Sequence, residues 1–230
     1  MKSLHIDQYE YELQIFGNDF IILKNESCGA LINSMIAKAI LERQFDFVKE
    51  AIASEEEILI ALKKPINQIE HLSQIVLEKE YTSQQWTLPF LLDSNADWDE
   101  IQTSTGLNQE EYLNLLLQTN LTMLMNGFLP GFSYLTGLPK ALHCPRKRTP
   151  STNIKSGSVA IGGPYVGIYP IDSPGGWNVI GHTPIRLING NRMPPSFLSP
   201  GDTVKLKLID NEQYDLLKKM DLDLNAYHSS

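Results

Sequence analysis

Residues 126–139, with the sequence NGFLPGFSYLTGLP, open the stretch that decides the fold of this chain. From there to Gly201 a turn signal recurs every few positions. These signals are Pro130-Gly131, Gly137-Leu138-Pro139, Gly162-Gly163-Pro164, Pro174-Gly175-Gly176, Asn189-Gly190, Pro194-Pro195 and Pro200-Gly201. Between them lie short β-forming runs at 158–161, 165–169, 177–180, 185–188 and 203–208. Short strands at such spacing favour a barrel or a sandwich, because a closed sheet leaves no exposed edge.

Charge sets the same block apart. Residues 126–201 contain two histidines and sum to about +6 by charge counting, with Asp172 as their one acid. The whole chain carries -8, so the remainder sums to about -14. A basic, turn-rich block therefore lies inside an acidic protein. The overall pI of about 5.1 argues against nucleic acid as the main partner, since phosphate neutralisation needs cations clustered over a whole face.

The composition is that of an ordinary globular chain of 230 residues, with 42% apolar and 20% charged residues. Cys28 and Cys144 lie far apart without C-x-x-C spacing, so neither a disulfide framework nor a zinc site is indicated, and we expect no metal. Charges interrupt the first ten positions, and no run of about 18 apolar residues appears. We therefore expect a cytoplasmic protein that is neither exported nor membrane-spanning.

The first 91 residues alternate β-forming and helical patterns. The expected elements are a hairpin over 11–24, a helix over 27–41 capped by Ser27, strands over 45–52 and 57–62, a helix over 67–77 capped by Asn67, and a strand over 84–91. This order predicts an α+β domain over residues 1–91, in which helices cover one face of a sheet.

Two helices of a different character lead into the turn-rich block. Acidic residues at 97–100 meet the positive end of the first helix dipole, and Gly106 ends that helix. Asn108 caps the second helix, and Glu111 completes a capping box. Residues 121–128 are expected to form a buried strand, and the last 20 or so residues an amphipathic helix. We assign residues 92–230 to a second domain, a helical connector followed by the β-barrel.

Five stretches of this second domain resemble one protein family. They are GFLPGFSYLTGLP at 127–139, PRKRTP at 145–150, GSVAIGG at 157–163, GIYPIDSPGGWNVIGHTP at 167–184 and PPSFLSPGDTV at 194–204. In this order they are similar to subunit 1 of the allophanate hydrolase family, which includes the 5-oxoprolinase subunit PxpB and the kinase inhibitor KipI. The resemblance covers about half of the chain, roughly residues 90–208.

The resemblance implies an α+β N-terminal domain followed by a cyclophilin-like closed β-barrel. It also implies a subunit, inactive alone, that pairs with a second cyclophilin-like subunit (PxpC/KipA-like) and, with a PxpA-like subunit, hydrolyses 5-oxoproline to glutamate using ATP. The sequence departs from the family pattern at Lys155-Ser156, at Pro164-Tyr165-Val166 and at His182, where the family has Pro-Ala, x-Gln-Thr and an arginine. These departures alter any polar contacts made there.

Opening a lactam against amide resonance needs a nucleotide site, an anchor for the carboxylate and a base. The chain has no G-x-x-x-x-G-K-[ST] sequence, so we expect ATP to be bound mainly by the partner subunits and no cofactor to be held tightly here. What this chain offers is a surface for a small carboxylate substrate. The expected substrate-binding residues are Arg146, Arg148, Lys155, Tyr134, Ser173, Gly175, Gly176 and Trp177. The backbone N–H groups of residues 173–176 are expected to converge as an anion-binding nest.

His182 and Asp172 are the candidates for proton transfer. A histidine at this position is either a general base tuned near neutral pH or a cap on a barrel strand. Asp172, the one acid of the block, is either the working carboxylate or a turn former. Ser158 lies in G-S-V and not in G-x-S-x-G, so no nucleophile elbow is predicted.

The binding candidates also have plain structural interpretations. The run from Arg146 to Arg148 is either a ligand clamp or a solvated loop, and Trp177 is either barrel packing or an interface anchor. The aromatic residues Phe128, Phe132 and Tyr134 fill a core or line a substrate wall. The turn at 174–176 needs glycine for positive φ in the simplest interpretation.

Three functions stay open from the sequence. The first is the 5-oxoprolinase subunit with a site shared between subunits. The second is a KipI-like inhibitor that binds a sensor histidine kinase and hydrolyses nothing; arginines splayed into solvent away from any concave surface favour it. The third is a carboxyltransferase-like subunit related to urea carboxylase, for which biotin has to arrive on another protein because the chain has no Met-Lys-Met sequence.

Overall fold

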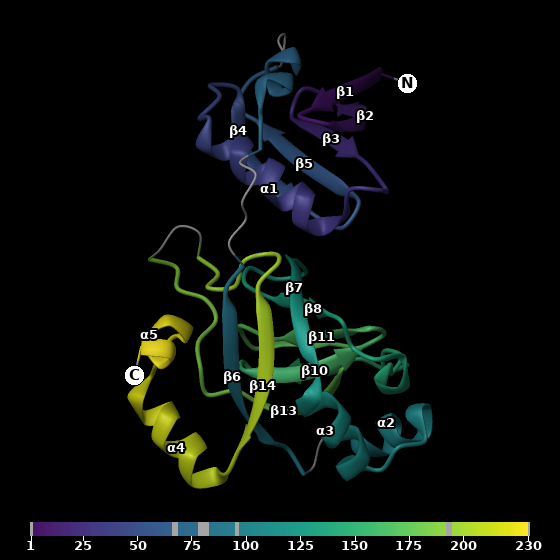
Figure 1. Ribbon diagram of the computed structural model, residues 1–230, viewed down its shortest axis with the longest axis vertical. Helices are drawn as coiled ribbons and strands as arrows, with labels where there is room; N and C mark the ends of the chain where they lie inside the picture. Colours follow the sequence, from purple (N-terminus) through teal and green to yellow (C-terminus); the bar gives the residue numbers. More distant parts are fainter. Residues whose placement is uncertain (1, 66–68, 78–82, 95–96, 192–194, 230) are drawn as a thin grey trace. The chain divides into compact units, whose positions relative to one another are not determined.

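The structure, a computed structural model, describes two compact units, Met1–Thr82 and Ser83–Ser230 (Figure 1). The described residues are 2–65, 69–77, 83–94, 97–191 and 195–229. The division falls nearer the N-terminus than the boundary after residue 91 that the sequence suggested, because strand β6 (Gln85–Leu92) pairs with strands of the second unit. No helix among the described residues is long and apolar enough to cross a bilayer.

The first unit is a five-stranded antiparallel sheet in the order β1-β2-β3-β5-β4. Its strands are β1 (Lys2–Ile6), β2 (Tyr9–Phe16), β3 (Phe20–Lys24), β4 (Val48–Ala53) and β5 (Glu57–Leu62). Helix α1 (Gly29–Glu42) and the 3-10 helix η1 (Ile69–Gln74) pack against it, and alternate strand residues such as Ile58 and Ile60 form the core. The predicted α+β arrangement and the β2–β3 hairpin are confirmed.

Local details of this unit differ from the prediction. Ser27 does not cap α1; the backbone N–H groups of Ser27 and Cys28 donate to Asn25 Oδ1 at 2.7 and 3.0 Å, so the shorter turn from Asn25 satisfies them. The helix predicted over 67–77 is the single 3-10 element η1, and its expected cap, Asn67, lies outside the described residues.

The second unit is built on a closed barrel of seven strands in the order β10-β11-β8-β7-β14-β6-β13. Besides β6, these are β7 (Asn120–Asn126), β8 (Ser133–Thr136), β10 (Ser158–Gly162), β11 (Tyr165–Ile168), β13 (Asn178–His182) and β14 (Thr203–Ile209). A ribbon of β9 (Ser151–Ile154) and β12 (Ser173–Gly175) lies outside it. The remaining elements are α2 (Trp98–Thr105), α3 (Gln109–Gln118), η2 (Lys140–Leu142), α4 (Asn211–Met220) and α5 (Leu224–Ser229). The predicted closed β-barrel is confirmed.

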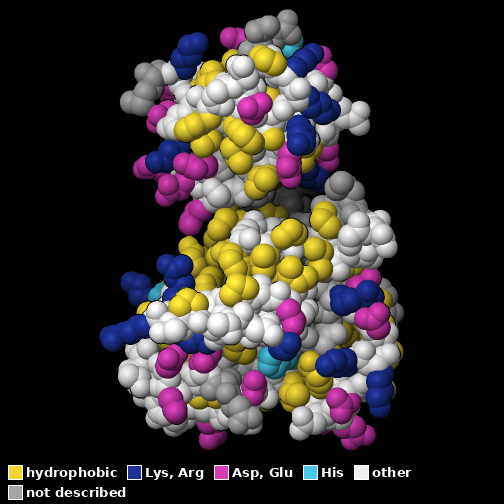
Figure 2. All heavy atoms as spheres, turned by 180° about the vertical axis from the view of Figure 1, so that it is seen from behind, with side chains coloured by type: hydrophobic (Ala, Val, Ile, Leu, Met, Phe, Trp, Pro, Cys, Tyr) yellow, Lys and Arg dark blue, Asp and Glu magenta, His cyan; other side chains and the backbone are white. Residues whose placement is uncertain are grey.

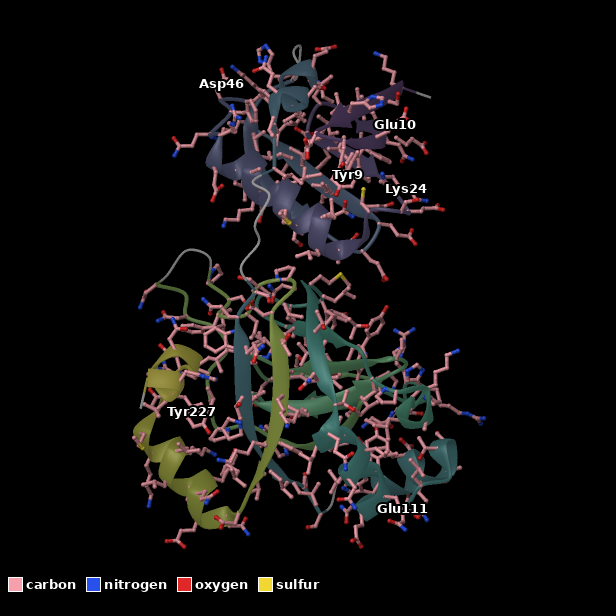
Figure 3. The ribbon with its side chains drawn as sticks, viewed as in Figure 1. Tyr9, Glu10, Lys24, Asp46, Glu111 and Tyr227 are labelled. Atoms are coloured by element: carbon pink, nitrogen blue, oxygen red, sulfur yellow. The ribbon has the colours of Figure 1, made fainter. Side chains whose placement is uncertain are left out.

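Turn and cap chemistry in this unit follows the sequence closely. Gly106 ends α2 with φ 75°, and the box at α3 is complete: Glu111 N–H donates to Asn108 Oδ1 at 3.0 Å and Asn108 N–H to Glu111 Oε2 at 2.9 Å (Figure 3). Two expectations were wrong. Residues 185–188 form isolated bridges and no strand, and the C-terminal segment is two helices, because Asp221 adopts φ 51° between them.

A single buried carboxylate, that of Asp202, ties the two parallel strands of the barrel together. It accepts hydrogen bonds from the Gln84 N–H and the Trp86 indole, both at 3.0 Å, and from the Ser199 N–H at 2.9 Å. Gln84 and Trp86 lie on either side of the first residue of β6, while Asp202 immediately precedes β14. The charge-assisted bonds therefore fix the register of a pairing between distant parts of the chain.

We predict that Asp202→Asn lowers the free energy of unfolding by about 3 kcal/mol, because the amide turns an N–H toward buried donors that now lack an acceptor. Urea denaturation measures the loss. Asp210→Asn is the matched control, since Asp210 is an exposed helix cap and asparagine caps equally well; its change should stay within about 0.5 kcal/mol. Equal stability of the two variants would contradict this role for Asp202.

The barrel has a second cluster of packed side chains on its outside. Its interior holds residues such as Val159, Ile161 and Ile180, whereas Phe132 and Trp177 pack with Ala160 on the outward face of the same strands. The cluster is Phe132, Ile154, Ala160, Tyr169 and Trp177, bordered by Leu129, Tyr134, Tyr165 and Val179. We call it the outer aromatic cluster.

Two strand glycines make room for this cluster. A Cβ at Gly162 would lie 2.3 Å from the indole of Trp177, and one at Gly167 would lie 2.5 Å from Trp177 and 2.6 Å from Phe132. No real Cβ tolerates such contacts without movement of the ring. At these two positions glycine is therefore needed so that the aromatic rings can approach the strand backbone, and not for a positive φ.

Gly162→Ala should therefore lower the free energy of unfolding by about 2 kcal/mol, because the methyl group displaces the Trp177 ring. Chemical denaturation followed by tryptophan fluorescence gives the value. Gly190→Ala provides the control: nothing lies within 4 Å of its added Cβ, and its stability should change by less than about 0.5 kcal/mol. An unchanged free energy of unfolding in Gly162→Ala would show that the Trp177 ring can shift without cost and would contradict this packing constraint.

Candidate functional site

Tyr134 and Trp177 lie together at the edge of the outer aromatic cluster. Tyr134 comes from β8 and is half-buried; its ring centroid is 5.4 Å from that of Trp177 and 6.0 Å from that of Tyr165, in edge-to-face geometry. Trp177 itself is buried, with Phe132 at 5.4 Å. The cluster thus acts as a packed wall, and the half-buried Tyr134 offers a hydroxyl group at its edge.

Arg146 lies within electrostatic reach of Tyr134. Burial raises the pKa of the Tyr134 hydroxyl, and the Arg146 guanidinium opposes this by favouring the charged form. Both arginines of the PRKRTP segment, Arg146 and Arg148, are exposed and form no ion pair among the described residues. The structure therefore places Arg146 within electrostatic reach of Tyr134, which packs on the buried Trp177, and Arg148 is nearby in sequence. We call these four residues the outer aromatic surface.

Lys147, between the two arginines, points the other way. Its Nζ donates to Asp97 Oδ2 at 2.9 Å and to Ser151 Oγ at 2.7 Å, and the lysine side chain is only 9% exposed. The same Asp97 oxygen accepts the Val179 N–H at 2.8 Å. Lys147 N–H also donates to the Gly176 carbonyl at 2.7 Å. These bonds anchor the arginine-bearing loop to β13 and to the PGGW turn.

Replacing Lys147 by methionine should lower the free energy of unfolding by about 2 kcal/mol, since the partly buried Asp97 carboxylate and Ser151 hydroxyl lose their common partner. Arg148→Met is the control, with an expected change within about 0.5 kcal/mol because the side chain is exposed. Urea melts of both variants provide the comparison. A larger loss in the arginine variant would contradict the anchoring role.

The predicted nest at residues 173–176 does not form. Ser173, Pro174 and Gly175 are the extended strand β12, paired with β9, and neither Gly175 nor Gly176 has positive φ. Gly175 is required for space instead, because its Cβ would lie 2.3 Å from the Tyr169 hydroxyl. The Ser173 hydroxyl is buried and has no hydrogen-bond partner among the described residues, which is unusual for a buried polar atom.

Lys155 and Asp172 form an exposed ion pair at 2.8 Å. Asp172 also accepts the Ser156 N–H at 2.8 Å. The hydrogen bond from Lys155, together with that from Ser156, lowers the pKa of the Asp172 carboxyl below its ordinary value. A carboxylate with a lowered pKa is a weak base, so the geometry fits the turn-forming role of Asp172 better than the proton-transfer role.

His182 has a partner on each ring nitrogen. Its Nδ1 lies 3.2 Å from Ser158 Oγ, directly opposite on β10, and its Nε2 lies 3.3 Å from Asp93 Oδ2. A neutral ring protonated on Nε2 satisfies both, with the serine hydroxyl donating and the carboxylate accepting. The trio has the composition of a nucleophilic triad, but Ser158 is fully buried, so its hydroxyl is placed to orient the imidazole and not to attack a substrate.

This hydroxyl–imidazole–carboxylate trio was missed by the sequence analysis, which considered Ser158 only as a nucleophile. A register shift between Val159 and Ala160 lets Ile180 pack in the barrel core while His182 stays opposite Ser158. Asp93 reaches the ring from just after β6. Strand register between distant segments carries no local sequence signal, so the pairing could not be found from spacing.

The predicted site residues thus fall into three groups. Tyr134, Arg146, Arg148 and Trp177 make up the outer aromatic surface, and Ser173, Gly175 and Gly176 belong to β12 and the residue after it. Lys155, Asp172 and His182 line a separate cavity of about 700 Å³. Within the described part of the chain, no group of three or more His, Cys, Asp or Glu side chains could hold a metal ion.

Comparison with known proteins identifies the family. Residues 18–198 match the family model of the carboxyltransferase domain, subdomain C and D. The chain belongs to this family. The resemblance seen in the turn-rich block is thereby confirmed, and the match takes in every predicted site residue, from Tyr134 to His182.

Individual relatives of this carboxyltransferase-domain protein carry more specific names. The 5-oxoprolinase B subunit from Escherichia coli O157:H7 is 32% identical over 202 residues, which are 83% of this chain and 93% of that relative. The protein of the same name from Bacillus subtilis (strain 168) is 34% identical over 152 residues, 65% of this chain and 63% of the relative.

A solved structure shares the fold. The crystal structure of the Kluyveromyces lactis urea carboxylase matches with a TM-score of 0.70 at 18% identity, over 96% of this chain. Only 24% of that larger chain is covered, so this carboxyltransferase-domain protein corresponds to one segment of it. At such identity the likeness extends to the fold alone.

Proposed function

We propose that this protein is the PxpB-like subunit of a cytoplasmic, ATP-dependent 5-oxoprolinase, which converts 5-oxoproline, ATP and water to glutamate, ADP and phosphate. The observation that carries the proposal is the match to the 5-oxoprolinase B subunit over 93% of the length of the Escherichia coli relative. The proposed subunit is inactive alone. It works with a second cyclophilin-like subunit (PxpC/KipA-like) and a PxpA-like subunit. ATP is bound mainly by these partner subunits.

The outer aromatic surface supports a role in holding the acidic substrate. Arg146 and Arg148 supply guanidinium groups that can form paired hydrogen bonds with a carboxylate, and Arg146 lies within electrostatic reach of the Tyr134 hydroxyl. Lys147 keeps the loop in place through Asp97. A surface of this kind is open in the isolated subunit, and a partner subunit that covers it would exclude water and strengthen each charged contact.

The reconstituted complex tests the proposal. Purified chain is mixed with the candidate PxpC/KipA-like and PxpA-like subunits, and ATP-dependent release of glutamate from 5-oxoproline is measured. Turnover is expected in the full mixture and in no subunit alone. Arg146→Ala and Arg148→Ala should each lower kcat/KM at least about tenfold, the equivalent of one charge-assisted contact.

Arg43→Ala serves as the control for the loss of an exposed arginine, since Arg43 lies in the first unit and its guanidinium donates to the Gln74 carbonyl at 3.4 Å. Its complex should turn over at the parental rate. Absence of glutamate in the complete mixture rejects the proposed function, whereas turnover that survives both arginine changes removes those arginines from the site.

A second function, inhibition of a sensor histidine kinase, is favoured by two surface features. Arg146 and Arg148 are exposed and do not line the cavity of about 700 Å³. Phe128 is 61% exposed with φ 64°, and it packs edge-on against Phe132 and Tyr169 of the outer aromatic cluster. Figure 2 shows apolar side chains gathered on a face of the second unit, with Lys and Arg side chains near them. An exposed aromatic in a strained backbone conformation is typical of a protein-binding contact. Lowered kinase autophosphorylation without turnover would select this function.

A further inference from the structure

The cavity of about 700 Å³ in the second unit lies between one end of the barrel and α4. Its floor is apolar and includes Ile168, Ile185 and Leu187, all of them buried. Tyr214 and Lys218 of α4 contribute to its wall. Its size lies within the range that small organic ligands occupy.

Three cations from separate segments of the chain line the cavity, together with the carboxylates of Asp172 and Asp221. Lys155 and Arg186 are each paired, with Asp172 at 2.8 Å and with Asp221 at 3.2 Å. Lys218 differs: among the described residues it forms no ion pair, and its Nζ lies 5.5 Å from the centroid of the Tyr214 ring. One cation that faces the cavity is therefore not neutralised by a neighbouring carboxylate.

His182 forms part of the inner wall and is not available to a ligand as a free base or donor. Both of its ring nitrogens are already bonded, to Ser158 and to Asp93. Recognition of an anion in this cavity consequently falls to Lys218, with Arg186 beside it. An apolar floor below a single free ammonium suits a carboxylate on a small hydrocarbon ring or chain better than a bare inorganic anion.

Helix α4 packs lightly against the rest of the unit. None of the side chains in Asn211–Met220 is buried, and Leu216 and Met220 are at least half exposed. Its first turn is capped by Asp210, and just beyond its last turn Asp221 pairs with Arg186. Figure 1 shows α4 outside the barrel, beside β6. Tyr214 and Leu217 are half-buried and the other side chains of α4 are exposed, so opening of this helix has a low cost in free energy.

We propose that this cavity binds a small carboxylate with an apolar body, and that α4 is the lid that closes over it through Lys218. The ligand would neutralise Lys218 and bridge α4 to the barrel floor, so binding stabilises the helix. The choice of 5-oxoproline as the first probe rests on the proposed function. The ligand class is argued from the residues that line the cavity and does not depend on that function.

Hydrogen exchange of the full chain, with and without 5-oxoproline, tests the inference. Saturable slowing of exchange in peptides covering α4 is expected. Lys218→Met should weaken the apparent affinity about tenfold, and Lys218→Arg, which keeps the charge, should retain it. Lys219→Met is the matched control, because Lys219 is on the same helix and does not line the cavity; it should bind like the parent chain.

Other outcomes overturn the inference. These are no slowing in α4, equal losses in the Lys218 and Lys219 variants, or inorganic phosphate producing the same protection at the same concentration. The reconstituted complex separates the two proposals: ligand protection that depends on Lys218 without any turnover rejects the 5-oxoprolinase function alone. Turnover in the complete mixture, with no ligand protection of α4 that depends on Lys218, rejects the lid site alone.

Discussion

The barrel depends on a parallel pairing between strands that are distant in sequence. β6 and β14 run side by side from Gln85 to Leu91, and Gln84 and Asp202 are 118 positions apart. Closing so long a loop costs entropy that grows only with the logarithm of its length, so a few well-placed bonds can fix it. The buried Asp202 carboxylate supplies them, and its own backbone carbonyl accepts the Met123 N–H of β7 at 2.7 Å. All the strands and loops that carry candidate site residues lie inside this closed loop.

The second constraint is the lack of side chains on two outward-facing strand positions. Gly162 and Gly167 allow Trp177 and Phe132 to pack closely against strands that would otherwise carry Cβ atoms there. The rings then support Tyr134, and Lys147 fixes the loop that brings Arg146 toward it. The geometry of the outer aromatic surface is therefore set by packing beneath it, although the groups that a substrate would touch are few.

Local chemistry was predicted well from the sequence because its causes lie within a few residues. The Asn108 capping box, the Gly106 helix end and the closed barrel follow from short-range cap and turn signals. The prediction was wrong where the structure depends on pairing between strands that are distant in the sequence. The strand at 85–92 looks like the end of the first unit until β14 pairs with it, and the His182 trio needs strand register to become visible. Glycines at 175–176 were predicted to make a turn, but space for Tyr169 explains Gly175 instead.

Ion pairs neutralise several cations of the basic block at residues 126–201. Lys147 is neutralised by Asp97 and Arg186 by Asp221, both from outside residues 126–201, while Lys155 pairs with Asp172 inside it. Of the described cations in the block, Lys140, Arg146 and Arg148 are left without an ion pair. Because paired surface charges contribute little to the field at a distance, the excess of about +6 counted from sequence reduces to a small cationic group at the PRKRTP loop. An acidic molecule attracted to the block is therefore drawn to that loop, beside Tyr134. The paired cations Lys147, Lys155 and Arg186 act at short range only.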